Sequence, residues 1–206
     1  MSILYSNNRL KYLKTINYPE INIDQDQMTF LVGKSGSGKS TYLKLLNRTL
    51  LTKEGIIEFN GKNINDLDVL SYRKEVLLVP QELFLINGTI RDNFYFYYNA
   101  RKEKHLNDEQ IKKFLSICVA NFSLDTDCRN LSGGERQRVF IAIFISLAKS
   151  VILLDEPTSA LDEKTSLELL TNLKKYFHDH QITSLIVSHN DYLVKQFADR
   201  IIKIGE

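Results

Sequence analysis

The chain has 206 residues, and its 27 lysines and arginines against 25 acidic residues leave a formal net charge of only +2. This balance argues against a dedicated nucleic-acid binder, which usually carries a clear basic excess. The longest apolar run, residues 139–148, is about half of what spans a bilayer. The N-terminus has no apolar segment of secretory type, and Cys118 and Cys128 match no zinc spacing. We therefore expect a reduced, cytosolic protein with one substantial core.

Residues 28–32 (MTFLV) form a short apolar run that predicts a buried strand. Residues 33–40 (GKSGSGKS) fit the pattern G-x-x-x-x-G-K-[ST], and leucines at helical spacing follow over residues 41–50. Glycines let backbone N–H groups surround phosphate oxygens, and a helix N-terminus adds partial positive charge. We predict a nucleoside triphosphate site here, formed by Gly33, Ser35, Gly36, Ser37, Gly38, Lys39, Ser40 and Thr41.

Two side chains of this loop have specific expected roles. Lys39 can bridge the β- and γ-phosphates, and the hydroxyl of Ser40 can hold Mg²⁺. The run VILLDE, residues 151–156, predicts a central parallel strand that ends in Asp155 and Glu156. Asp155 would hold the Mg²⁺ and Glu156 would polarise the attacking water. Two solvated acids at an ordinary strand end are the alternative, which the phosphate loop disfavours.

The segment LSGGERQR, residues 131–138, predicts a second anion site. Ser132 can cap a helix that continues through residues 140–147, and two glycines expose N–H groups beside it. One phosphate loop already satisfies one triphosphate, so a second site of this shape suggests that a second copy of the protein closes over the nucleotide. A plain capped helix is the alternative.

LSGGERQR resembles the signature of the ATP-binding-cassette (ABC) ATPases. Other segments resemble further motifs of that family, in the family's order and spacing. Gln81 in LLVPQE resembles the Q-loop glutamine, and DEPTS resembles the extended Walker B segment. SALD resembles the D-loop, and His189 in SLIVSHN resembles the switch histidine. The resemblance covers essentially the whole chain. It implies Mg²⁺-dependent ATP hydrolysis, with ATP and Mg²⁺ as cofactors.

The resemblance also implies residue roles. Gln81 would sense the metal and the attacking water, Glu156 would be the general base, and His189 would contact the γ-phosphate. The γ-phosphate bound by the opposite subunit of a homodimer or paired cassette would meet Ser132 and Gly134. Asp162 would line the dimer seam.

The family usually stacks an aromatic residue on adenine. By spacing, Tyr5 and Tyr12 both qualify. Tyr5 is favoured because residues 13–23 resemble the strand region that follows that aromatic.

The expected fold is α/β: a P-loop NTPase core with a mostly parallel sheet, an antiparallel β edge subdomain and an inserted helical subdomain. Core strands are predicted at residues 76–79, 151–154, 184–187 and 200–204, and the edge sheet within residues 1–32 and 56–61. One domain, residues 1–206, would divide into a catalytic core with the β subdomain at about 1–87 and 149–206, and a helical subdomain at about 88–148.

The resemblance points to the nucleotide-binding subunit of a transporter, peripheral on the inner face of the cell membrane through a separate integral membrane permease. Residues 80–93 (PQELFLINGTIRDN) resemble the Q-loop region of ABC exporters, which favours export. Glu135 and the segment LDTDCRN depart from fused exporters and indicate a small stand-alone cassette. A non-transport ABC ATPase of translation or DNA repair is the alternative, and nucleic acid is not an expected partner.

Five consecutive aromatic residues, Phe94 to Tyr98, cannot all face one core from a helix. Either two or three are core residues and the rest are scattered on the surface, or some line a groove for a cytoplasmic helix of the permease. The second interpretation is favoured.

Overall fold

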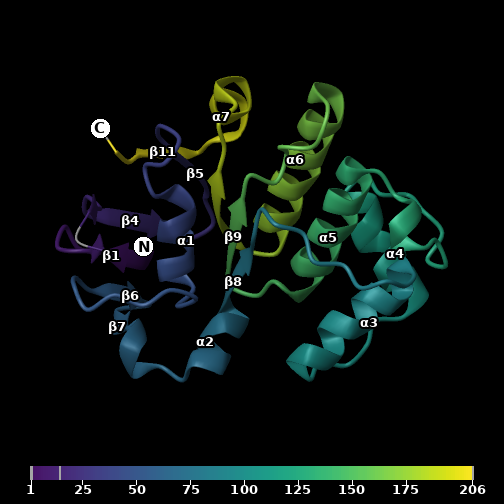
Figure 1. Cartoon of the computed structure of the whole chain (residues 1–206), viewed down its shortest axis with the longest axis horizontal. Coiled ribbons are helices and arrows are strands. Elements are labelled where there is room, and N and C mark those ends of the chain that lie inside the picture. The colour runs from purple at the N-terminus through teal and green to yellow at the C-terminus, as the bar shows by residue number, and fades with distance from the viewer. Residues whose placement is uncertain (1, 14, 206) are drawn as a thin grey trace.

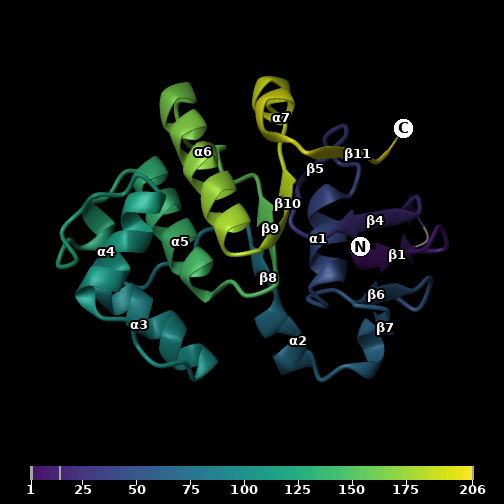
Figure 2. The same cartoon turned by 180° about the vertical axis from the view of Figure 1, so that it is seen from behind.

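The computed structural model describes residues 2–13 and 15–205. Met1, Lys14 and Glu206, which fall within the expected domain, lie outside the described residues. Two sheets lie side by side with helix α1 (Lys39–Leu46) between them, and the remaining long helices cover the far face of the larger sheet (Figure 1, Figure 2). This is the α/β class that the sequence predicts.

The larger sheet is parallel throughout, with the strand order β11-β5-β10-β9-β8. Its strands match the predicted core strands to within one residue at either end. They are β5 (Met28–Val32), β8 (Val76–Val79), β9 (Val151–Asp155), β10 (Thr183–Val187) and β11 (Arg200–Lys203).

The smaller sheet is antiparallel, with the order β4-β1-β6-β7. Its strands are β1 (Ser2–Ser6), β4 (Ile21–Asp24), β6 (Ile57–Phe59) and β7 (Lys62–Asn63), and a separate hairpin pairs β2 (Lys11–Tyr12) with β3 (Ile16–Asn17). The predicted edge sheet is confirmed. The expected strand region over residues 13–23 contains β3 and most of β4, and it begins with a turn in which Leu13 adopts a left-handed backbone (φ 51°).

Two hydrophobic cores lie on opposite faces of the parallel sheet. In β9, Val151 and Leu153 belong to the core shared with α1 and the antiparallel sheet, whereas Ile152 and Leu154 belong to the core shared with the other helices. Alternate residues of a strand point to opposite faces, so one apolar run supplies both cores. This is why the central strands read as continuous apolar runs.

The other helices are α2 (Val69–Glu75), α3 (Ile90–Arg101), α4 (Asp108–Ile117), α5 (Gly133–Leu147), α6 (Glu163–Asp179) and α7 (Asp191–Phe197), with short 3₁₀ turns η1 (Ile64–Asp66) and η2 (Cys128–Asn130). Helix α1 ends at Leu46, four residues before the predicted end, because Arg48 adopts a left-handed backbone (φ 59°).

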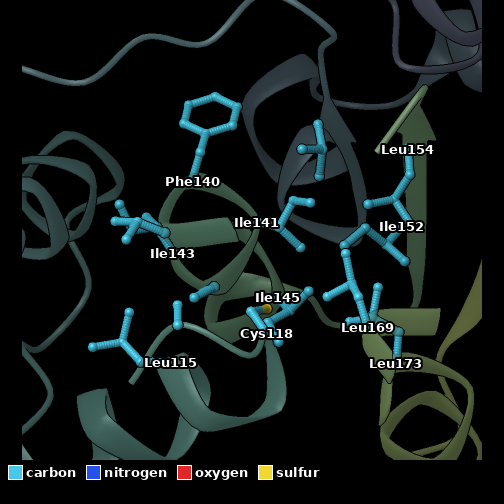
Figure 3. Packing of buried hydrophobic residues seen from close by; sticks show 14 of the residues in the cluster. Leu115, Cys118, Phe140, Ile141, Ile143, Ile145, Ile152, Leu154, Leu169 and Leu173 are labelled. Atoms are coloured by element: carbon cyan, nitrogen blue, oxygen red, sulfur yellow. The ribbon is translucent and has the colours of Figure 1, made fainter. Parts of the chain in front are cut away.

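Helix α5 is the buried centre of the helical side. Figure 3 shows Ile141 and Ile145 of α5 among side chains from β9, α4 and α6, with Ile141 toward Ile152 of β9 and Leu115 on the α4 side. In the helix predicted to continue through residues 140–147, Phe140, Ile143 and Leu147 are buried, and Phe144 is half-buried. Because α3, α4 and α5 share this core with the sheet, the division at residues 88 and 148 stays a prediction.

The thiols of Cys118 and Cys128 are both free and buried. Among the described residues, no helix is both long enough and apolar enough to cross a membrane.

Candidate functional site

The phosphate loop, residues 33–38, connects β5 to α1 as predicted. Gly38 is the N-cap of α1 and has a left-handed backbone (φ 91°), a conformation that glycine adopts at low cost. Gly33 and Ser37 pack against Ile204 and Gly205 of the segment that follows β11.

Lys39 extends back over the loop. Its ammonium nitrogen Nζ donates hydrogen bonds to the carbonyl oxygens of Gly33 (2.8 Å) and Lys34 (2.9 Å). Burial lowers the pKa of Lys39, while the charges of Glu156 and Asp155 act in the opposite direction. The ammonium is therefore held at the loop, close to both carboxylates.

Ser40 and Asp155 form the link between the loop and the central strand β9. The Ser40 hydroxyl donates to Oδ1 of Asp155 at 3.0 Å. Burial raises the pKa of Asp155, an effect reinforced by Glu156 and opposed by the hydrogen bond from Ser40. An adjacent hydroxyl and carboxylate are a donor set that suits Mg²⁺, which is often held by one or two carboxylates together with substrate phosphates. The described residues contain no cluster of three or more His, Cys, Asp or Glu side chains that could hold a metal by themselves.

Both carboxylate oxygens of Glu156 contact a neighbouring side chain. Gln81 donates from Nε2 to Oε2 at 3.2 Å, and Nε2 of His189 lies 3.1 Å from Oε1. The backbone of Glu156 is left-handed (φ 51°), which is uncommon for a residue with a side chain, and its N–H donates to the carbonyl of Val187 at 3.1 Å. Two other predicted residues, Gln81 and His189, thus meet at the carboxylate of Glu156, and the three come from separate segments.

These groups surround one hollow of about 290 Å³. It is lined by Ile16, Ser35, Gly36, Gly38, Lys39, Ser40, Thr41, Gln81, Glu156 and His189. Nine of these ten residues were predicted, and Ile16 was not.

The predicted second anion site lies elsewhere on the molecule. Ser132 caps α5 by accepting from the N–H of Glu135 at 3.4 Å, and Glu135 accepts in return from the N–H of Ser132 at 2.8 Å. These hydrogen bonds lower the pKa of Glu135. Because the Ser132 oxygen serves as the cap acceptor, its proton is free to donate to an anion. Ser132 is exposed and lies outside the lining of the hollow.

Asp162 and Gly134 both make contacts within their own chain. Asp162 caps α6 by accepting from the N–H and hydroxyl of Thr165, and these hydrogen bonds lower its pKa. Gly134 lies so close to the segment before α6 that a Cβ there would be 2.7 Å from the carbonyl oxygen of Ala160. The start of α5 therefore packs directly on residues 159–161.

Gln137 is a site residue that the sequence reasoning missed. Its Nε2 donates to the carbonyl of Glu156 (3.1 Å) and to Oγ of Ser159 (3.4 Å), and its Oε1 accepts from the N–H of Ala160 (3.2 Å). It is only 4% exposed. The available signal was a polar side chain on the apolar face that Phe140 and Phe144 continue.

Tyr5 does not reach the hollow. It lies in the middle of β1, opposite Asn22 of β4 and Glu58 of β6, whereas the β2–β3 hairpin reaches the phosphate loop through Ile16. Tyr12 is the residue opposite Ile16 in that hairpin. The preference for Tyr5 rests on the strand region over residues 13–23, and that stretch instead holds the second half of the β2–β3 hairpin, which Tyr12 begins, followed by β4.

Comparison with known proteins agrees with this geometry. Residues 16–159 match the model of the family described as ABC transporter. The chain belongs to this family. It is the ATP-binding subunit of an ABC transporter, and such cassettes are ATPases.

Individual relatives show the extent of the likeness. The chain is 37% identical over 181 residues to "ABC transporter I family member 17" of Arabidopsis thaliana, covering 87% of this chain and 68% of that protein. It is 34% identical over 203 residues to "Phosphate import ATP-binding protein PstB" of Borreliella afzelii, covering 91% and 76%. The solved "Dimeric Structure of MJ0796, a Bacterial ABC Transporter Cassette" superposes with a TM-score of 0.84 at 28% identity, covering 98% and 94%.

Proposed function

We propose that this cassette hydrolyses Mg²⁺-bound ATP between two copies and drives a separate integral membrane permease, as an export-type subunit on the cytoplasmic face. The observation that carries the hydrolytic step is the convergence of Gln81 and His189 on Glu156, at the edge of the hollow that the phosphate loop forms. A carboxylate fixed in this way at a phosphate site is suited to orient a water and accept its proton.

Each residue of the hollow has a place in this proposal. Lys39 and the loop N–H groups bind the phosphates, and Ser40 with Asp155 holds Mg²⁺, which when bound neutralises phosphate charge. His189 positions the carboxylate of Glu156 from one side and contacts the γ-phosphate. Tyr12, on the hairpin that supplies Ile16, is the candidate for stacking on adenine in place of Tyr5.

The pairing of two copies is supported by where the second anion site lies. Ser132 and Gly134 stand at the exposed start of α5 and outside the hollow of their own chain. A two-fold, head-to-tail pair would bring each α5 start over the partner's nucleotide and complete both sites at once. The γ-phosphate would then hold the pair together, and hydrolysis would loosen it.

Glu156→Gln tests both steps, because it keeps the shape of the side chain and loses the base. We expect this variant to bind ATP with Mg²⁺, fail to hydrolyse it and sediment as a dimer. Adding Ser132→Arg should abolish the dimer and preserve ATP binding by the monomer. A monomeric Glu156→Gln at saturating ATP would contradict the pairing, and one that still turns over ATP would contradict the base.

The permease contact is proposed on an exposed aromatic pair, Phe84 and Phe96. Of the five consecutive aromatics, Phe94 and Tyr98 are buried, and Phe96 is 39% exposed. The ring centroids of Phe84 and Phe96 lie 5.9 Å apart, and the hydroxyl of Tyr97 donates a hydrogen bond to the carbonyl oxygen of Phe84 at 2.6 Å. Exposed aromatic pairs of this kind are common anchors at protein interfaces.

Export is proposed from residues 80–93, which contain this pair's first member and resemble the exporter Q-loop region. Because the relative PstB of Borreliella afzelii is named as a phosphate import protein, the direction of transport needs its own test. Co-purifying the permease and measuring ATP-dependent cargo movement in inside-out vesicles decides it: uptake into such vesicles is export, and cargo loss from them is import.

A further inference from the structure

Tyr18 is a buried residue beside the phosphate loop to which no role has been given above. It follows β3 directly and is 2% exposed. Its backbone N–H donates to the carbonyl of Leu10 at 3.0 Å, and its ring packs on the ring of Tyr42 in α1, with centroids 5.0 Å apart. The Tyr18 side chain is therefore fixed from both ends.

The hydroxyl of Tyr18 donates to the carbonyl oxygen of Gly38 at 3.0 Å. Gly38 is the left-handed residue at which the phosphate loop becomes α1. A Cβ on Gly38 would lie 2.9 Å from that hydroxyl and 2.8 Å from Cγ2 of Ile16. Tyr18 and Ile16 thus both pack against the backbone of the phosphate loop at Gly38.

The carbonyl of Gly38 and the N–H of Lys39 belong to the same planar peptide group and point in opposite directions. Fixing the carbonyl toward Tyr18 therefore fixes the N–H within the same plane, pointing away from Tyr18. Lys39 and Ser40 begin α1, where backbone N–H groups are available to an anion.

We propose that Tyr18 is a positioning residue for the triphosphate, whose hydroxyl locks the Gly38–Lys39 peptide in the orientation that binds phosphate. The role lies outside the hydrolytic and pairing steps proposed above and concerns the affinity of the loop itself. It acts on the phosphates and not on the base.

Tyr18→Phe removes the hydroxyl and keeps the ring. The Gly38 carbonyl still accepts from the N–H of Tyr42 at 2.8 Å, so no buried acceptor is left unpaired and the fold should persist. We expect the affinity for both ATP and inorganic tripolyphosphate to fall by the same factor, about two- to tenfold, the equivalent of one net hydrogen bond. KM for ATP should rise by that factor while kcat is unchanged.

Tyr72→Phe is the matched control. The hydroxyl of Tyr72 donates to the backbone carbonyl of Leu46, so it makes the same kind of bond to the same helix at its other end. Both affinities should stay at the wild-type value in this variant.

Calorimetric titration or displacement of a fluorescent nucleotide measures both affinities, and a thermal melt reports the fold. Unchanged affinities in Tyr18→Phe, equal losses in both variants, or a loss for ATP alone would each overturn the proposal. An unfolded Tyr18→Phe would also overturn it, by showing that the bond supports the fold and not the loop. A wild-type protein that binds neither ligand would overturn the triphosphate site itself.

Discussion

Gln137→Ala should remove the side-chain link between α5 and Glu156, the proposed general base. The side-chain amide of Gln137 makes three hydrogen bonds, of 3.1, 3.2 and 3.4 Å, and is 4% exposed. Truncation leaves the N–H of Ala160 without its partner and opens a small void, whereas the carbonyl of Glu156 still accepts from the N–H of Ser159 at 3.2 Å. A buried neutral group that loses its partner costs about 1–3 kcal/mol. Because the bond is long and Ala160 is an exposed residue, we take the lower half of that range and expect about 1–2 kcal/mol.

For a chain of this size, that loss corresponds to a fall in melting temperature of roughly 2–8 °C. The functional expectation is a lower kcat, because the carbonyl and the side chain of Glu156 belong to one residue in a left-handed backbone conformation. Gln137→Glu refines the test: its carboxylate can still accept from Ala160 but faces the Glu156 carbonyl as a second acceptor. This variant should lower kcat as well.

Gln196→Ala, at an exposed position on α7, is the control and should leave melting and kcat unchanged. Thermal melts followed by circular dichroism, together with steady-state ATPase assays, supply both measurements. A Gln137→Ala protein that melts with the wild type and hydrolyses ATP at the wild-type kcat would refute the reasoning.

Three further outcomes are expected. Lys39→Ala removes a charge-assisted contact to phosphate, so ATP affinity should fall at least tenfold and hydrolysis should be lost, as titration calorimetry and phosphate release would show; retained turnover would argue against the loop. Asp155→Asn should abolish hydrolysis yet raise the melting temperature at neutral pH, because burial raises the pKa of Asp155 and the ionised form is therefore destabilised in the fold. That gain should vanish as pH falls through the folded pKa, where Asp155 is protonated and neutral; a melting gain that is independent of pH would exclude this cause. Phe96→Ala should spare basal ATPase but reduce stimulation by the co-purified permease, whereas Ile201→Ala, also at an exposed apolar position, should not; equal stimulation in both would leave Phe96 an ordinary surface residue.

The phosphate loop and the strand-end acids were predictable because their geometry is local. A loop between a strand and a helix needs glycine at the left-handed position, and Gly38 marks it in the sequence. Apolar runs give the central strands because both sheet faces are covered. Gln81 and His189 were identified only through the family resemblance. They meet Glu156 because all three residues follow parallel strands, whose carboxyl ends share one edge.

The misplaced and missed residues have physical causes that one sequence does not display. Leu13 adopts a left-handed backbone although leucine has no preference for it, so the hairpin that brings Ile16 to the loop left no glycine or asparagine signal. Gln137 acts through tertiary contacts with residues about twenty positions away, and spacing within a helix cannot reveal such partners.

The electrostatics of the hollow explain why a divalent cation belongs to the proposed reaction. Among the described residues that line it, Lys39 supplies the only ammonium or guanidinium, while Glu156 lines it and Asp155 stands directly behind Ser40. A triphosphate brings several negative charges into this space. Two like charges about 4 Å apart repel by about 4 kcal/mol at the effective dielectric constant of about 20 that suits protein surfaces. One ammonium that already donates to two carbonyl oxygens offsets only part of that repulsion. The Ser40–Asp155 pair is where oxygen ligands for a cation are already assembled, so phosphate binding and metal binding should be coupled at this pair.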